Sequence, residues 1–127
     1  MSTNALIVYE KKNGKYDCIS VEYDGYIKEG VGETLHRYWH NDFDIKKLCA
    51  VKDDIRSLGF EFDDVEFYHR PNRANSAKMK NLTWDEVVEM NWCSYVYVHF
   101  QTDGDVESHW AVYDEESDDF EPLSFYL

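Results

Sequence analysis

Two histidines stand four residues apart, at His36 and His40, within a stretch whose apolar residues recur at helical spacing. Residues four apart share one face of a helix, and two imidazoles on one face can hold a metal ion. The zinc-protease pattern also requires a glutamate directly after the first histidine, and Arg37 occupies that position. The spacing therefore favours surface or interface histidines, and we expect neither a metal ion nor a cofactor.

A second pair of histidines falls in the C-terminal part of the chain. In "SYVYVHF", alternation predicts a strand with Val96 and Val98 on one side and His99 on the other. If Trp110 shares the side of Val96, a three-residue loop places His99 opposite His109. We interpret such a pair as a cross-strand contact, because a metal site would need two more ligands.

Three pairs of aspartates have the residue types for acid and base chemistry. They are Asp42 with Asp44, Asp53 with Asp54, and Asp63 with Asp64. Carboxylates in loops are usually solvated, and no adjoining apolar segment would plainly desolvate any of these six. A nucleophile, a base and a stabilising group cannot be assembled around them. We therefore predict no catalytic residue and a protein that is not an enzyme.

The strongest anomaly is the C-terminal quarter, where no lysine or arginine follows Lys80. Its carboxylates are Asp103, Asp105, Glu107, Asp114, Glu115, Glu116, Asp118, Asp119 and Glu121. Two interpretations stay open, a solvated face of the kind that most charge runs form and a binding surface. On strands and turns, carboxylates about 5 to 7 Å apart imitate the spacing of successive DNA phosphates. Nearby Tyr and Trp side chains would supply interface anchors.

The formal net charge of −13 argues against binding to a nucleic-acid backbone, because phosphates attract lysine and arginine. A partner selected by electrostatics would therefore be basic. No apolar run approaches the roughly 20 residues of a membrane helix, and the start "MSTNALIVYEKK" lacks a secretory signal. We expect a cytoplasmic protein that does not enter membranes. Its oligomeric state stays open.

The three cysteines, Cys18, Cys49 and Cys93, are widely spaced and form no Cys-x-x-Cys motif. An odd number of separated cysteines indicates neither a disulfide framework nor a zinc knuckle. We predict that all three are buried thiols, because cysteine prefers protein interiors.

Turn and capping signals divide the chain into elements. Asn13-Gly14 lies between two β-rich runs and predicts an N-terminal hairpin. Helical spacing predicts two short helices between 31 and 50, and a third strand is expected at 64–70. Thr83, with Glu86 three residues later, has the capping-box arrangement and begins a further helix.

The C-terminal segments predict a second hairpin, with its turn at Asp103-Gly104. The two hairpins would form one antiparallel sheet with the helices packed on one face, which is an α+β fold in a single acidic domain over residues 1–127. Four large residues should be buried in its core, namely Trp39, Val96, Val98 and Trp110.

The stretch "VEYDGYIKEGVGETLHRYW" (21–39) changes from strand-like to helix-like spacing in its middle. Asp24-Gly25 suits a turn, and Gly30 and Gly32 let the chain enter a helix at close quarters. Glycines before a helix can also cradle a phosphate. That alternative is weak here, because Glu29 and Glu33 place negative charge where the phosphate would lie.

At this joint the sequence resembles a family of small proteins of phages, prophages and related mobile elements. The resemblance is carried by Asp24-Gly25-Tyr26 with Gly32, by "DIRSLGF", "SYVYVHF" and "HWAVYD", and by Glu121-Pro122-Leu123. It implies a mobile-element protein that acts inside a bacterium, and it brings no established active site.

Charge and resemblance together lead to one main hypothesis. The protein would inhibit a basic, nucleic-acid-binding host protein, such as a defence nuclease, by occupying its nucleic-acid site through the acidic residues above, with Tyr26 as a further contact. It would act as a DNA mimic. The alternatives are a small metal-dependent module that uses the histidines, and a folded accessory protein without inhibitory activity.

Overall fold

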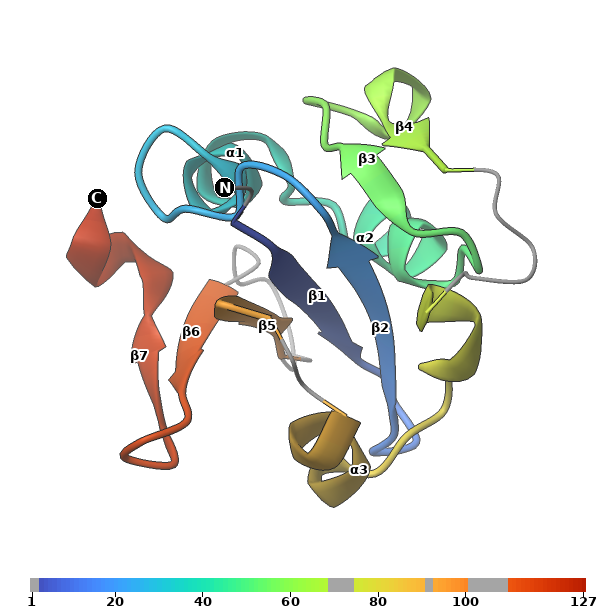
Figure 1. The fold of residues 1–127 in the computed structure, drawn as a ribbon, viewed down its shortest axis with the longest axis vertical. Coiled ribbons are helices and arrows are strands. Elements are labelled where there is room, and N and C mark those ends of the chain that lie inside the picture. The colour runs from blue at the N-terminus through green and yellow to red at the C-terminus, as the bar shows by residue number, and fades with distance from the viewer. Residues whose placement is uncertain (1–2, 69–74, 91–92, 101–109) are drawn as a thin grey trace.

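The computed structural model describes residues 3–68, 75–90, 93–100 and 110–127. These residues form a seven-stranded sheet with the order β4-β3-β2-β1-β5-β6-β7, so that β4 and β7 are its edges (Figure 1). The strands are β1 (Ala5–Glu10), β2 (Tyr16–Val21), β3 (Ile55–Ser57), β4 (Glu66–Phe67), β5 (Tyr95–His99), β6 (Trp110–Asp114) and β7 (Asp119–Pro122). The helices are α1 (Val31–Tyr38), α2 (Asp42–Cys49) and α3 (Trp84–Met90), with 3₁₀ turns η1 (Phe62–Asp64), η2 (Asn75–Lys78) and η3 (Leu123–Tyr126).

The β1–β2 hairpin is confirmed. Gly14 has φ +82° and donates its N–H to the Lys11 carbonyl at 3.0 Å, while the Lys11 N–H donates to the Lys15 carbonyl at 2.8 Å. The Asn13 side chain accepts the Lys15 N–H at 2.9 Å. Glycine suits this position because a side chain is strained at positive φ.

The α+β class is also confirmed, but the sheet is larger than two hairpins. Strand β1 pairs with β5 in parallel, and β2 pairs in parallel with the short strand β3, which the sequence did not reveal. The strand expected at 64–70 is the two-residue strand β4. Strand β1 is central because nearly all of "ALIVYE" is buried, and a strand buried on both faces belongs in the middle of a sheet.

Helices cover both faces of the sheet, so the expectation that they pack on one face is wrong. Ile7 and Tyr9 of β1 belong to a core cluster with residues of α1 and α2. Leu6 and Val8 of the same strand belong to a second cluster, with Val87 of α3 among its members. Alternation along a strand that is apolar from Ala5 to Tyr9 creates two faces that both require cover.

The helix signals correspond to real caps. Asn41 accepts the N–H groups of Phe43 at 2.9 Å and Asp44 at 3.3 Å, which ends one short helix and begins the next. Thr83 and Glu86 exchange side-chain and backbone hydrogen bonds of 3.1 and 3.2 Å at the start of α3. These contacts satisfy N–H groups that lack a partner at helix starts.

Trp39, Val96, Val98 and Trp110 are all buried, as predicted. The proposed register of the C-terminal strands is wrong, however, because Trp110 pairs with His99 and therefore lies on the side opposite Val96 and Val98. On that side the Trp110 indole N–H donates to the Trp39 carbonyl at 2.9 Å. His99 therefore pairs with Trp110, and His109, its expected partner, lies outside the described residues.

The turn of the expected C-terminal hairpin, at residues 103–105, lies outside the described part. Strand β7 ends at Pro122, and the following residues form η3. Among the described helices, the longest have eight residues, and none is long and apolar enough to cross a membrane.

Candidate binding surface: an acidic hairpin beside an aromatic groove

The β6–β7 hairpin carries most of the acidic residues that the sequence singled out. We define the acidic hairpin by its exposed carboxylates, Asp114, Glu115, Glu116, Asp118, Asp119 and Glu121. Its turn is held internally, because the Glu116 N–H donates to the Asp114 carboxylate at 3.0 Å and Asp118 adopts φ +52°. The charged side chains thus project from a short turn whose backbone conformation is held by an internal hydrogen bond.

Two of these carboxylates belong to residues that are paired across the two strands. Asp114 and Asp119 are cross-strand partners at the end of the ladder. Like charges opposite each other destabilise an antiparallel pair. Strand β7 is also a sheet edge, and charge on an edge strand discourages pairing with another sheet. The paired carboxylates therefore destabilise the hairpin by repulsion, and they discourage the edge strand from pairing with another sheet.

Tyrosine hydroxyls hold two other carboxylates in place. Tyr113 donates to Asp118 at 2.5 Å, and this hydrogen bond is the main reason that the pKa of Tyr113 rises to about 12. Tyr126 donates to Glu121, and this contact likewise raises the pKa of Tyr126. Both tyrosines stay protonated at neutral pH, so they remain donors to the carboxylates.

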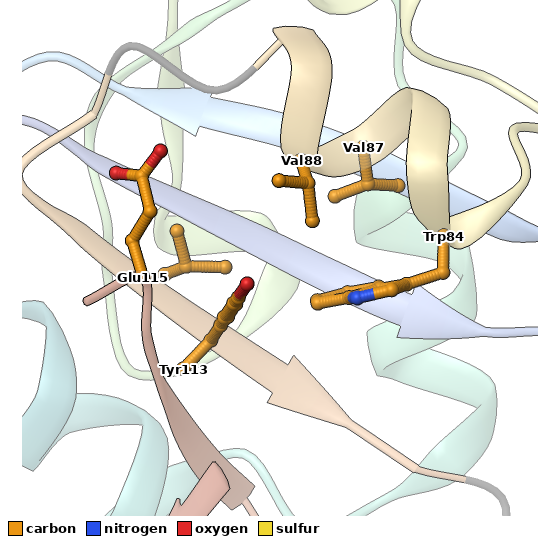
Figure 2. Close-up of a pocket in the computed structure, with 6 residues that line it drawn as sticks. Trp84, Val87, Val88, Tyr113 and Glu115 are labelled. Carbon is orange, nitrogen blue, oxygen red and sulfur yellow. The ribbon is translucent and has the colours of Figure 1, made fainter. Parts of the chain in front are cut away.

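A groove opens between α3 and the acidic hairpin. In Figure 2 the side chains of Trp84 and Val88 point from the helix toward Tyr113 on β6, and Glu115 stands at the side. Trp84 stacks on Tyr113 with ring centroids 5.0 Å apart and packs against Phe120 at 5.1 Å. The floor of the groove is therefore aromatic and aliphatic.

Carboxylates surround the mouth of this groove. Asp85 and Glu89 come from α3, and Glu115 and Asp118 come from the acidic hairpin. The ion pairs found in the described part of the chain lie elsewhere, between Lys11 and Asp17 at 3.5 Å, and between Arg37 and Glu33 at 3.7 Å. Within the described residues, the four groove carboxylates thus have no lysine or arginine at ion-pair distance.

The other predicted site residues are placed differently. Asp103, Asp105 and Glu107 lie outside the described residues. Tyr26 is 48% exposed, and it belongs to the joint after β2, a different element from the acidic hairpin. The structure therefore brings together six of the predicted acidic residues.

The joint itself is tied into the core. The Gly25 N–H donates to the Thr3 carbonyl at 2.8 Å, and the Gly25 carbonyl accepts the buried Tyr97 hydroxyl at 2.6 Å. The N–H groups of Val31 and Gly32 donate to carbonyls of the joint at 2.7 and 3.1 Å. These backbone donors are used internally, which favours a strand-to-helix joint over a phosphate cradle.

His40 and His99 lie in different surroundings. His40 bonds the Arg37 carbonyl at 2.9 Å through its Nε2 atom. His99 is 3% exposed and lies against the rings of Tyr9 and Trp110, at centroid distances of 5.7 and 5.2 Å. Across the described ranges, no group of three or more His, Cys, Asp or Glu side chains is close enough to hold a metal ion.

The cysteines largely match their prediction. Cys18 and Cys49 are buried and Cys93 is half-buried. Burial raises the pKa of Cys18 and of Cys93 to about 12, and it raises the pKa of Cys49 as well. Thiols with such values are protonated at neutral pH and are poor nucleophiles.

Lys80 is an interior group that the sequence did not reveal. Its ammonium donates to the carbonyls of Cys18 at 2.6 Å and Cys49 at 2.5 Å, which joins β2 to the end of α2. Burial lowers the pKa of Lys80. The residue serves the fold, because a cation suits the negative end of a helix.

The α3 side of the groove was also missed. Trp84 and Val88 are four residues apart and share a helix face with the hairpin opposite. The helical spacing could be seen in the sequence, but its packing partner on β6 could not.

Comparison with known protein families, with curated protein sequences and with solved structures gave no match for this chain.

Proposed function

We propose that this chain is a small acidic binding protein that occupies the nucleic-acid site of a basic partner. In this proposal it is a phage-type protein in the cytoplasm of a bacterial host, and its target is a nucleic-acid-binding host protein such as a defence nuclease. The observation that carries the proposal is the acidic hairpin, whose six exposed carboxylates stand on one built turn and its strands.

Charge density supports a mimic of nucleic acid. Side chains on one face of a strand repeat about every 7 Å, and cross-strand neighbours lie about 5 Å apart. A basic groove that tracks phosphates would meet a similar series of negative groups on this hairpin. The net charge of −13 adds long-range attraction for a basic protein.

The opposed pair Asp114 and Asp119 gives further support. Repulsion across the ladder weakens the hairpin, although charge on the edge strand β7 also discourages pairing with another sheet. A cationic partner that lies over both carboxylates would remove the repulsion. Binding therefore accounts for a feature that is unfavourable in the isolated protein.

A mimic of this kind works by stoichiometric occupancy without turnover. Charge attraction would speed its encounter with the partner, and added salt would slow that encounter. The partner would be unable to hold nucleic acid and this protein at once. Both properties are measurable without knowledge of the partner's activity.

The test uses immobilised protein and bacterial lysate at low and high salt. The control carries five neutral substitutions, Asp114→Asn, Glu115→Gln, Glu116→Gln, Asp118→Asn and Asp119→Asn. The wild type should retain a basic protein at low salt that the control does not retain, and the retained protein should lose its DNA binding in the complex. Recovery of no basic protein at low salt, or a complex that still binds DNA, would overturn the proposal.

A further inference from the structure

The groove between α3 and the acidic hairpin has a more specific chemistry than the acidic surface as a whole. We propose that it is an arginine pocket, which receives the guanidinium group of one arginine on the partner protein. This inference rests on the proposed function, because it names the contact by which a basic partner would be recognised. It concerns the side chains in Figure 2, together with the carboxylates at the groove mouth.

The floor of the groove carries partly exposed aromatic rings. Trp84 and Tyr113 stack with an interplanar angle of 23°, so each ring covers part of the other, and both are half-buried. Val88 completes the apolar lining. A planar guanidinium can lie against the exposed part of these rings, since aromatic rings attract cations and tryptophan does so most strongly. The aliphatic stem of an arginine would cover the valine.

The mouth of the groove offers acceptors from two directions. Asp85 and Glu89 stand four apart on α3, where like charges repel, and Glu115 and Asp118 approach from the hairpin. One cation between these elements would compensate repulsion on both. The five N–H donors of a guanidinium lie around the edge of its plane and can reach acceptors on two sides. An ammonium is a compact point charge that does not stack on aromatic rings. The geometry therefore selects arginine over lysine.

The occupant comes from another molecule. In the part of the chain that the structure describes, no lysine or arginine is at ion-pair distance from the groove carboxylates. The net charge of −13 attracts basic proteins, whose nucleic-acid sites are rich in arginine. An arginine of the partner's nucleic-acid site is thus the occupant with matching charge and shape.

The experiment compares two peptides of equal length and equal charge, one built with arginine and one with lysine. Calorimetry at low salt gives both affinities for the wild-type protein. We expect the arginine peptide to bind about three- to fivefold more tightly, which corresponds to a cation–π contribution at a partly exposed site. Nuclear magnetic resonance should show the Trp84 indole N–H signal shifting with the arginine peptide.

Matched variants assign the preference to the groove. The double variant Glu115→Gln/Asp118→Asn removes two charges at the groove, and Asp63→Asn/Asp64→Asn removes two exposed charges from η1. Both should weaken binding through net charge, but only the groove variant should abolish the preference for arginine. Val88→Lys should also abolish it, because the new ammonium would occupy the groove.

Three results have distinct meanings. A preference for arginine that disappears only in the two groove variants supports the pocket. Equal affinity for both peptides, with equal losses in the two double variants, overturns the pocket and leaves the acidic-surface proposal intact, because general Coulomb attraction would then explain the binding. No binding of either peptide by the wild type would overturn both proposals.

Discussion

The joint after β2 and the acidic hairpin use their polar groups in opposite ways. At the joint, the N–H and carbonyl groups of Gly25 bond Thr3 and the buried Tyr97 hydroxyl, so its polar atoms are used within the fold. On the hairpin, six carboxylates are exposed, and two of them oppose each other across the ladder. A glycine-rich motif can thus serve the fold alone. Charged groups whose mutual repulsion lowers the stability of the fold are better candidates for binding a partner.

The largest expected effect concerns the core and alkaline pH. The buried thiols of Cys18, Cys49 and Cys93 have pKa values raised above their ordinary 9.0. Above pH 9 the unfolded chain loses thiol protons that the folded chain keeps, so the free energy of unfolding falls as pH rises. Each unfolded thiol loses about one proton between pH 8 and pH 10, which corresponds to about 1.4 kcal/mol, so three thiols give an expected loss of roughly 4 kcal/mol.

One group with the opposite pH dependence and two variants make this prediction more specific. Lys80 acts in the opposite direction, because burial lowers its pKa, and the three thiols outweigh it. Urea unfolding at several pH values should show a shallower alkaline slope for Cys49→Ala, while the neutralised hairpin variant keeps the wild-type slope. A stability that stays constant to pH 10 would show that the thiols are not buried as described.

The second expected effect breaks the joint. A Cβ atom at Gly25 would lie 2.6 Å from the Asn4 carbonyl oxygen, so Gly25→Ala forces the backbone to shift. Overpacking of this kind costs about 1–3 kcal/mol of unfolding free energy. Denaturant unfolding measures the loss, and Lys28→Ala in the same exposed loop is the control that should change little.

The joint variant should still bind. Gly25 is remote in sequence from the acidic hairpin, and a folded molecule of the variant retains all six hairpin carboxylates. Its affinity for the arginine peptide should equal that of the wild type at a temperature where both are folded. A large loss of affinity in a folded Gly25→Ala protein would move the binding site toward the joint.

Local signals in the sequence were reliable predictors of local structure. Asn13-Gly14 predicted its turn because positive φ favours glycine, and Thr83 with Glu86 predicted the cap that forms. The cap of α2 is a contact of the same local kind, because the Asn41 side chain accepts N–H groups of the helix that follows it. Each of these signals depends on residues within a few positions of one another.

Contacts between segments far apart in the chain could not be predicted from the sequence. The parallel contact of β1 with β5 joins segments about 90 residues apart, and no turn encodes it. The place of Trp110 follows from its hydrogen bond to the Trp39 carbonyl, which lies in a different element. The groove beside Trp84 arises in the same way, since α3 supplies only part of its lining and the rest comes from β5, β6 and the following turn. Composition could therefore identify the acidic hairpin, but not the aromatic groove beside it.

The smallest expected effect concerns a single hydroxyl. Tyr113→Phe keeps the ring that stacks on Trp84 and removes the hydrogen bond to the exposed Asp118. We expect a stability loss of about 0.5–1.5 kcal/mol and a retained preference for the arginine peptide, because the aromatic face is unchanged. Thermal unfolding and calorimetry of this variant measure the two quantities. Loss of the preference with the ring in place would show that the hydroxyl, not the face, selects arginine.

The most direct test of binding through the acidic hairpin is the rate of association with the captured basic partner as a function of salt. Stopped-flow measurements compare the wild type with the variant neutralised at Asp114, Glu115, Glu116, Asp118 and Asp119, and circular dichroism verifies that both are folded. We predict that the wild type associates at least about tenfold faster at low salt, and that its rate falls with added salt much more steeply than that of the variant. Equal rates with equal salt dependence would contradict the account and would place the contact elsewhere, with exposed Tyr26 at the joint as the first region to examine.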